Sequence, residues 1–198
     1  MKSLPTYQGR VISNENRKAR SASGPFFMDS NQTLMPNKTL VLGLGNELYG
    51  DDGVGIHVVR RFKQNIEKNA TFIKGRRNID FLECSLTGLA LLDVIVGYDT
   101  LVIIDTIKSS TPEAGKICLL DGADLRHIPG PSPHYVSIPQ MIEMGQKLGL
   151  KVPMQIKIIA VEAKDMYNLG EGLTPEMEKA VPRIIRELQK LLAQLQKS

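Results

Sequence analysis

Short apolar runs alternate with longer amphipathic or apolar segments from residue 39 to the end of this 198-residue chain. Runs of about four to eight residues rich in Val, Ile and Leu are typical of buried strands. We expect strands at residues 39–45, 79–84, 100–106, 115–120 and 155–163. We expect helices at residues 53–67, 86–98, 137–148 and 174–196. This alternation predicts an α/β fold in which helices cover both faces of a mostly parallel sheet.

The last predicted helix contains a proline in its interior. Pro182 has no backbone N–H to donate, and its ring clashes with the carbonyl group four residues earlier. We therefore expect Pro182 to kink or divide the helix. The apolar residues that follow it share one face, which we expect to point inward: Ile184, Leu188, Leu191, Leu192 and Leu195.

The first 37 residues differ in composition from the rest of the chain. They are polar, lack helical or strand periodicity, contain turn-forming residues throughout and have no apolar segment of a secretory signal. We expect residues 1–37 to be a disordered N-terminal extension and residues 38–198 to form a single α/β domain. Residues 1–38 carry a net charge of +4, equal to that of the whole chain, so residues 39–198 are neutral.

Charge, hydropathy and cysteine content narrow the function classes. A neutral domain lacks the basic footprint of nucleic-acid-binding proteins. No stretch approaches the roughly 18 uninterrupted apolar residues of a membrane helix. Cys84 and Cys118 lie in apolar runs and form no CxxC pair, so we expect both in the core of a protein from a reducing compartment. We therefore expect a cytoplasmic protein with no nucleic-acid and no membrane partner.

The segment GLGNELYGDDGVG, at residues 43–55, joins the first predicted strand to the first predicted helix. A dinucleotide-binding turn needs the pattern G-x-G-x-x-G, and Leu48 occupies the position of its third glycine. Asp51 and Asp52 would also stand at the helix N-terminus and repel a phosphate there. Nucleotide binding is therefore the weakest of the functions that we consider.

The two adjacent aspartates of this segment allow different interpretations. An aspartate at a helix start accepts hydrogen bonds from exposed N–H groups and stabilises the helix by roughly 0.5–2 kcal/mol. We assign this capping role to Asp51, which leaves Asp52 unexplained. Three nearby glycines, Gly50, Gly53 and Gly55, are then interpreted as backbone positions that leave open space around a carboxylate.

A second carboxylate is expected beside Asp52. The apolar run of the strand at 100–106 is stopped by Asp105. The carboxyl ends of parallel strands lie at one edge of a sheet, and ligand sites form in the crevice beyond them. We therefore expect Asp52 and Asp105 to meet at that edge.

The three histidines differ in context. His134 ends the proline-stiffened loop PSPH, which can aim its imidazole, whereas His127 follows DLR in a loop and is a weaker candidate. We expect His57 on a solvated helix face. Two carboxylates and His134, from three separate segments, make a candidate divalent-metal site with open positions.

Four segments in this order resemble the hydrogenase maturation endopeptidases: GLGNELYGDDGVG, VIIDT, SPH and GLTPE. The resemblance runs from about Thr39 to the end of the chain. It implies a three-layer α/β/α fold with a twisted, mostly parallel five-stranded sheet. It also implies a protease that removes a C-terminal peptide from the large-subunit precursor of a nickel–iron hydrogenase once nickel has been inserted.

The resemblance carries three metal-contacting positions over to this sequence, at Asp52, Asp105 and His134. It implies that the nickel is presented by the substrate, with another divalent metal as a substitute in vitro, and we expect the enzyme to be a monomer. A metal that polarises the scissile carbonyl and activates water would need no covalent enzyme intermediate. A non-catalytic checkpoint protein that binds the nickel-loaded precursor is an alternative, and whether Asp51 or His127 assists stays open.

Overall fold

The computed structural model describes residues 37–68, 78–126, 138–164, 166–167, 169–170 and 172–196. The predicted N-terminal extension, up to residue 36, lies outside the described residues, and so do His127 and His134. The disorder expected of the extension and the metal-contacting role expected of His134 therefore stay predictions.

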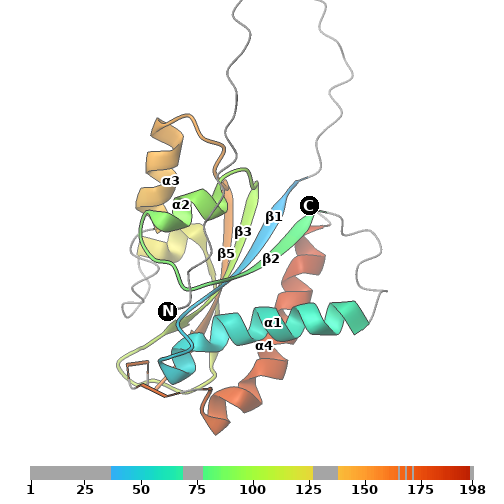
Figure 1. Cartoon of the computed structure of the whole chain (residues 1–198), viewed down its shortest axis with the longest axis vertical. Helices are drawn as coiled ribbons and strands as arrows, with labels where there is room; N and C mark the ends of the chain where they lie inside the picture. Colours follow the sequence, from blue (N-terminus) through green and yellow to red (C-terminus); the bar gives the residue numbers. More distant parts are fainter. Residues whose placement is uncertain are drawn as a thin grey trace, which may run out of the picture. The chain divides into compact units, whose positions relative to one another are not determined.

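Five strands in the described part of the chain form one sheet (Figure 1). They are β1 (Thr39–Leu44), β2 (Ile79–Cys84), β3 (Thr100–Ile107), β4 (Ile117–Asp121) and β5 (Gln155–Glu162). The strand order is β2-β1-β3-β5-β4; the first four are parallel, and β4 is antiparallel to β5. The predicted mostly parallel five-stranded sheet is confirmed.

The described residues also contain α1 (Val54–Lys68), α2 (Ala90–Ile95), α3 (Ile138–Lys147) and α4 (Pro175–Leu195). α1 and α4 cover one face of the sheet, and α2 and α3 cover the other, each pair with its own apolar cluster. On β1, Leu40, Leu42 and Leu44 point toward α2 and α3, because alternate residues of a strand face opposite sides. The fold therefore has the three α/β/α layers that the motifs implied.

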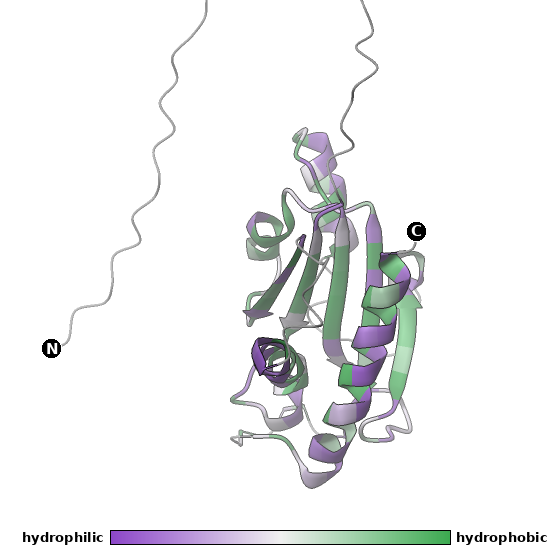
Figure 2. Ribbon diagram, turned by 90° about the vertical axis from the view of Figure 1, so that its right-hand side faces the viewer, coloured by the Kyte–Doolittle hydropathy of each residue, from purple (hydrophilic) through white to green (hydrophobic). Residues whose placement is uncertain are grey.

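The buried helix faces follow the expected apolar pattern. On α4, Ile184, Leu188 and Leu192 are fully buried, and Leu191 and Leu195 pack partly buried against the same cluster. Figure 2 shows the strands largely in green and the helices with both green and purple residues, as expected for elements with one buried face. None of the helices in the described residues is long and apolar enough to cross a membrane.

α4 runs unbroken from Pro175 to Leu195, so Pro182 does not divide the helix, and the kink expected there stays a prediction. An interior proline costs a helix about 3 kcal/mol. Burying a leucine or isoleucine side chain contributes about 1.5–3 kcal/mol, and α4 buries Ile184, Leu188 and Leu192 completely. The burial of this face therefore outweighs the cost of the proline.

α2 is shorter than the helix predicted at 86–98. Gly88 has a φ of +62°, and Gly97, two residues after the end of α2, has a φ of +90°. Between them Val96 is already extended, with φ −63° and ψ 137°. The apolar run overestimated the helix because its glycines adopt left-handed conformations that a right-handed helix excludes.

The chain changes direction across the sheet between β1 and β3. From β1 it passes through α1 to β2 on one side, and from β2 it returns through α2 to β3 on the other side. Ligand sites in such sheets form beyond the carboxyl ends of the two strands at this switch point. The pairing of β1 with β3 ends at Gly43 and Ile104, so Asp105, Thr106 and Ile107 extend past it.

Gly55, in the first turn of α1, is packed against the backbone of the sheet. A Cβ atom at this position would lie 2.3 Å from the carbonyl oxygens of both Leu44 and Ile104. The absence of a side chain therefore lets α1 rest directly on the ends of β1 and β3. The interpretation that Gly55 leaves open space around a carboxylate is wrong, because backbone atoms fill that space.

Gly53 and Gly50, which we also interpreted as leaving open space around a carboxylate, differ from each other. A Cβ atom on Gly53 would lie 3.0 Å from the Cα atom of Glu47, so this position is also closely packed, and the interpretation is wrong there too. Gly50 meets nothing closer than 3.7 Å, but its φ of +54° is one that L-residues with side chains rarely adopt. Backbone conformation rather than access explains Gly50.

Gly55→Ala is expected to destabilise the protein by about 2 kcal/mol or more, because the new methyl group would force two backbone segments apart. The measurement is the urea midpoint of unfolding followed by circular dichroism. Gly170→Ala is the matched control, since a Cβ atom there would meet nothing within 4 Å, and its effect should stay within about 0.5 kcal/mol. Equal midpoints for the two variants would contradict the packing argument.

Candidate active site

Asp52 lies in a short 3-10 helix, η1 (Gly50–Gly53), which leads from the turn after β1 into α1. The residue is only 7% exposed. Its Oδ2 accepts a hydrogen bond from the backbone N–H of Asn46 at 2.9 Å, and its Oδ1 accepts one from the hydroxyl of Thr106 at 2.9 Å. A buried carboxylate is costly unless it is hydrogen-bonded, and these two donors hold Asp52 in one orientation.

Asp105 is fully buried near the carboxyl end of β3. Its Oδ1 accepts a hydrogen bond from the backbone N–H of Thr106 at 2.8 Å. Ile107 follows Thr106 on β3, and its carbonyl accepts a hydrogen bond from the N–H of Ala163, on the side of β5. Successive residues of a strand direct their backbone groups to opposite sides. The N–H of Thr106 therefore points to the other side, where β1 has already ended. Asp105 therefore supplies the acceptor that a longer β1 would have supplied.

Thr106 joins the two carboxylates, because its hydroxyl donates to Asp52 and its backbone N–H donates to Asp105. The structure thus places two of the three predicted site residues against one shared partner near the carboxyl end of β3, and the third, His134, lies outside the described residues. Sequence reasoning missed Thr106. Its place directly after the strand-ending aspartate, in VIIDT, was the available signal.

Asp51 does not cap its own helix, so that interpretation is wrong. Both of its carboxylate oxygens accept from Thr174: Oδ1 from the backbone N–H at 2.8 Å and Oδ2 from the hydroxyl at 3.0 Å. Thr174 is in turn the N-cap of α4 and accepts from the N–H of Met177 at 3.3 Å. Asp51 therefore fixes the start of α4 against the turn, which explains why GLTPE accompanies the glycine-rich motif.

Two backbone hydrogen bonds strengthen the same junction. The N–H of Gly50 donates to the carbonyl of Gly170 at 3.0 Å, and the N–H of Gly170 donates to the carbonyl of Leu48 at 3.0 Å. They form a parallel bridge between Tyr49 and Gly170. The segment that carries Asp52 is therefore held by the sheet on one side and by the approach to α4 on the other.

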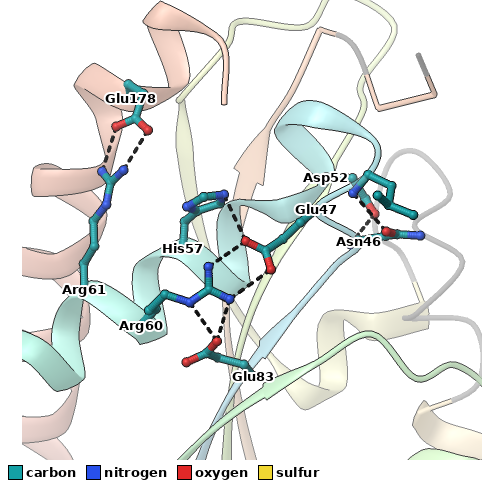
Figure 3. A network of polar contacts seen from close by, with 9 residues as sticks. Asn46, Glu47, Asp52, His57, Arg60, Arg61, Glu83 and Glu178 are labelled. Carbon is teal, nitrogen blue, oxygen red and sulfur yellow. Dashed lines mark hydrogen bonds and ion pairs between the residues drawn. The ribbon is translucent and has the colours of Figure 1, made fainter. Parts of the chain in front are cut away.

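A network of ion pairs covers the outer side of the turn (Figure 3). The guanidinium of Arg60 binds both carboxylate oxygens of Glu47, at 2.7 and 2.9 Å, and its Nε donates to Glu83 at 3.0 Å. Arg61 makes a second bidentate pair with Glu178 of α4, at 2.7 Å for both bonds. Hydrogen bonding by Arg60 lowers the pKa of Glu47, and Arg61 does the same to Glu178.

His57 is part of this network, so the prediction of a solvated surface histidine is wrong. Its side chain is 18% exposed, and its Nε2 lies 3.4 Å from Oε1 of Glu47. Burial lowers the pKa of His57, and this effect exceeds the opposite effect of the Glu47 charge. Glu47 directly follows Asn46, whose backbone N–H donates to Asp52. The ion-pair network therefore fixes the outer side of the turn after β1, and Asn46 fixes the carboxylate of Asp52 on its inner side.

The described residues contain no group of three or more His, Cys, Asp and Glu side chains that could hold a metal ion. Asp52 and Asp105 supply hard oxygen donors, and further ligands must come from another part of the chain or from a substrate. Cys84 is buried, and burial raises the pKa of its thiol, which disfavours a thiolate nucleophile. Cys84 is thus a core residue as predicted, whereas Cys118 is only partly buried and packs against the same apolar cluster.

Arg60→Met is expected to lower the free energy of unfolding by about 0.5–1 kcal/mol near pH 7, since solvent screens these half-exposed pairs. Arg60 lowers the pKa of Glu47 below its ordinary value of 4.5. The stability from this pair is therefore present above that pH and is lost as the pH falls through the folded-state pKa. The difference between variant and wild type should shrink as the pH falls below 4.5.

Urea unfolding at several pH values measures this difference. Lys190→Met is the control, because Lys190 pairs at 2.8 Å with Glu187 on the exposed side of α4, away from the turn. Its effect should be a few tenths of a kcal/mol, about the value of a single exposed helix pair. A difference for Arg60→Met that grows in acid would contradict the assigned role.

Comparison with known proteins identifies the family. The sequence profile of HycI, a hydrogenase maturation protease, matches residues 56–191, a span that begins just after Asp52 and contains Asp105. The chain is 26% identical over 150 residues to the hydrogenase expression/formation protein HupD of Bradyrhizobium diazoefficiens, covering 73% of this chain and 72% of that protein. It is also 26% identical over 161 residues to HupD of Rhodobacter capsulatus, covering 77% and 72% respectively.

Solved structures agree on the fold. The hydrogenase-maturating endopeptidase HybD of E. coli superposes with a TM-score of 0.65 at 21% identity, covering 79% of this chain and 93% of that one. The nickel–iron hydrogenase maturation protease HybD of Thermococcus kodakarensis superposes with a TM-score of 0.58 at 24% identity, covering 78% and 98%. The chain therefore belongs to the hydrogenase maturation protease family and is a processing endopeptidase.

Proposed function

We propose that this protein removes a C-terminal peptide from the large-subunit precursor of a nickel–iron hydrogenase after nickel has been inserted. Membership of the maturation protease family supports the class of reaction. The names of the HupD relatives support a hydrogenase as the client. The observation that carries the proposal is the pair of buried aspartates, Asp52 and Asp105, joined by Thr106 at the switch point of the sheet.

In this proposal Asp52, Asp105 and His134 contact the nickel that the precursor already holds, so the metal is part of the substrate. Carboxylate oxygens and an imidazole nitrogen suit Ni²⁺, and the same ligands suit Zn²⁺ as a substitute in vitro. Each oxygen of Asp52 accepts one hydrogen bond and has another lone pair for a cation. An incoming cation would also compensate two negative charges that lie in poorly solvated positions.

These buried charges support a reaction that depends on nickel loading. A precursor without nickel brings no cation to Asp52 and Asp105, so its complex is weaker and its cleavage slower. The nickel of a loaded precursor polarises the scissile carbonyl and activates water, without a covalent enzyme intermediate. We also propose that the enzyme is a monomer in the cytoplasm, a compartment that the two free cysteines favour.

Two alternatives differ in what they require of the site. A non-catalytic checkpoint protein would use the same residues to bind the loaded precursor and would release it uncut. A nucleotide-binding protein needs a glycine turn open to phosphate, whereas a Cβ atom on Gly45 would lie 1.9 Å from the carbonyl oxygen of Asp52. The backbone of Asp52 fills this turn, which disfavours the nucleotide alternative.

Asp52→Asn and Asp105→Asn are each expected to lower kcat for the nickel-loaded precursor at least about 100-fold, because a neutral amide is a poorer cation ligand. The measurement is cleavage followed by intact mass, with circular dichroism to check the fold. Asp99→Asn is the control at the opposite end of β3, where Asp99 pairs with Lys151 at 2.7 Å. Wild-type cleavage by Asp52→Asn would overturn the proposed site.

Cleavage of the precursor in its nickel-loaded and nickel-free forms tests the gate. Loss of one C-terminal peptide from the loaded form alone is expected. Equal cleavage of both forms would keep the protease and remove the nickel gate. A stable complex with the loaded precursor and no product would favour the checkpoint protein, and steady hydrolysis of casein would contradict a single folded client.

A further inference from the structure

Thr106 lies between the two site carboxylates and makes hydrogen bonds to both, which the regular geometry of a strand does not require. Asp105 and Thr106 are consecutive, so their side chains leave β3 on opposite faces of the sheet. Asp105 nevertheless turns its Oδ1 to the backbone N–H of Thr106, at 2.8 Å. The Thr106 hydroxyl reaches Asp52, at 2.9 Å, on the face covered by α1. One residue thus contacts both carboxylates from two directions.

Both hydrogen bonds are sheltered from water. Asp105 and Thr106 are each 0% exposed, and Asp52 is 7% exposed. A hydroxyl that donates to a carboxylate makes a charge-assisted bond, which is stronger than a bond between neutral groups. The β-branched side chain also restricts χ1, so Thr106 presents its hydroxyl in few orientations. Thr106 therefore limits the motion of Asp52 relative to β3.

Resting on the proposed function, we propose that Thr106 is a positioning residue that couples Asp52 to Asp105, so that a single nickel ion in the precursor meets both carboxylates in one fixed arrangement. Thr106 itself contacts no nickel in this proposal. Its hydroxyl fixes Oδ1 of Asp52, while Asn46 fixes Oδ2. Loss of the hydroxyl frees Asp52 to turn away from Asp105, while both carboxylates remain in the chain.

Thr106→Val tests the coupling, because valine keeps the shape and the strand preference and removes only the donor. We expect kcat for the nickel-loaded precursor to fall about 10- to 100-fold, the range for a lost hydrogen bond to a charged group, and KM to rise up to about tenfold as recognition of the metal weakens. Thr106→Ser keeps the donor and should recover kcat to within about threefold of wild type. Thr100→Val is the matched control, since Thr100 on the same strand donates to Gln155 at 3.1 Å, away from the site.

Binding supplies a readout besides activity. The ratio of the Kd for nickel-free precursor to the Kd for nickel-loaded precursor measures how well the protein recognises the metal. Thr106→Val alone should lower this ratio about tenfold. In a protein that already carries Asp52→Asn, adding Thr106→Val should change the ratio little, because the effects of coupled residues are not additive. A wild-type ratio and kcat for Thr106→Val, with both still reduced in Asp52→Asn, would overturn the role of Thr106 and leave the proposed site intact.

The other outcomes separate the two proposals. Wild-type behaviour of Asp52→Asn would overturn both, since Thr106 acts through Asp52. If Thr106→Val does not fold, the pair Thr106→Ser and Thr106→Ala isolates the hydroxyl, and equal kcat values for these two would overturn the inference. A hydroxyl needed only for folding, with normal nickel recognition in every folded variant, would overturn it as well.

Discussion

The close contact between α1 and the ends of β1 and β3 is the constraint on which the site depends. Gly55 lies against the carbonyls of Leu44 and Ile104, where no side chain fits. The first turn of α1 therefore rests on two central strands, at the point where the chain changes direction across the sheet. Because η1 leads directly into α1, the same contact places Asp52 beside the end of β3, where it accepts a hydrogen bond from Thr106.

Buried charge is the cost of that arrangement, and hydrogen-bond donors offset it. Asp51 is held by Thr174 of the α4 cap, Asp52 by Asn46 and Thr106, and Asp105 by the backbone of Thr106. Asp51 and Asp52 thus have donors from other elements, whereas the donor to Asp105 is its neighbour on β3. Outside them, Arg60 ties the turn to β2 through Glu83. In the function that we propose, this negative charge meets a cationic group of the substrate.

The layers of the fold could be predicted from periodicity, since apolar runs and helical faces report which residues are buried whatever their neighbours. The ends of α2 could not, because Gly88 and Gly97 act through φ angles that hydropathy does not reveal. The glycines of the first turn were misinterpreted for a related reason. A glycine beside empty space and one beside another backbone, such as Gly55, look the same in sequence.

The sequence by itself determined the order of strands and helices along the chain, the family, and the two aspartates expected beyond the carboxyl end of β1 and near that of β3. Tertiary structure alone decided the partners: Asp51 with Thr174, His57 with Glu47, and Thr106 between Asp52 and Asp105. The physical reason is that a hydrogen bond needs an angle and about 3 Å between atoms. Only the folded backbone brings residues as distant in the chain as Asp51 and Thr174 to that separation.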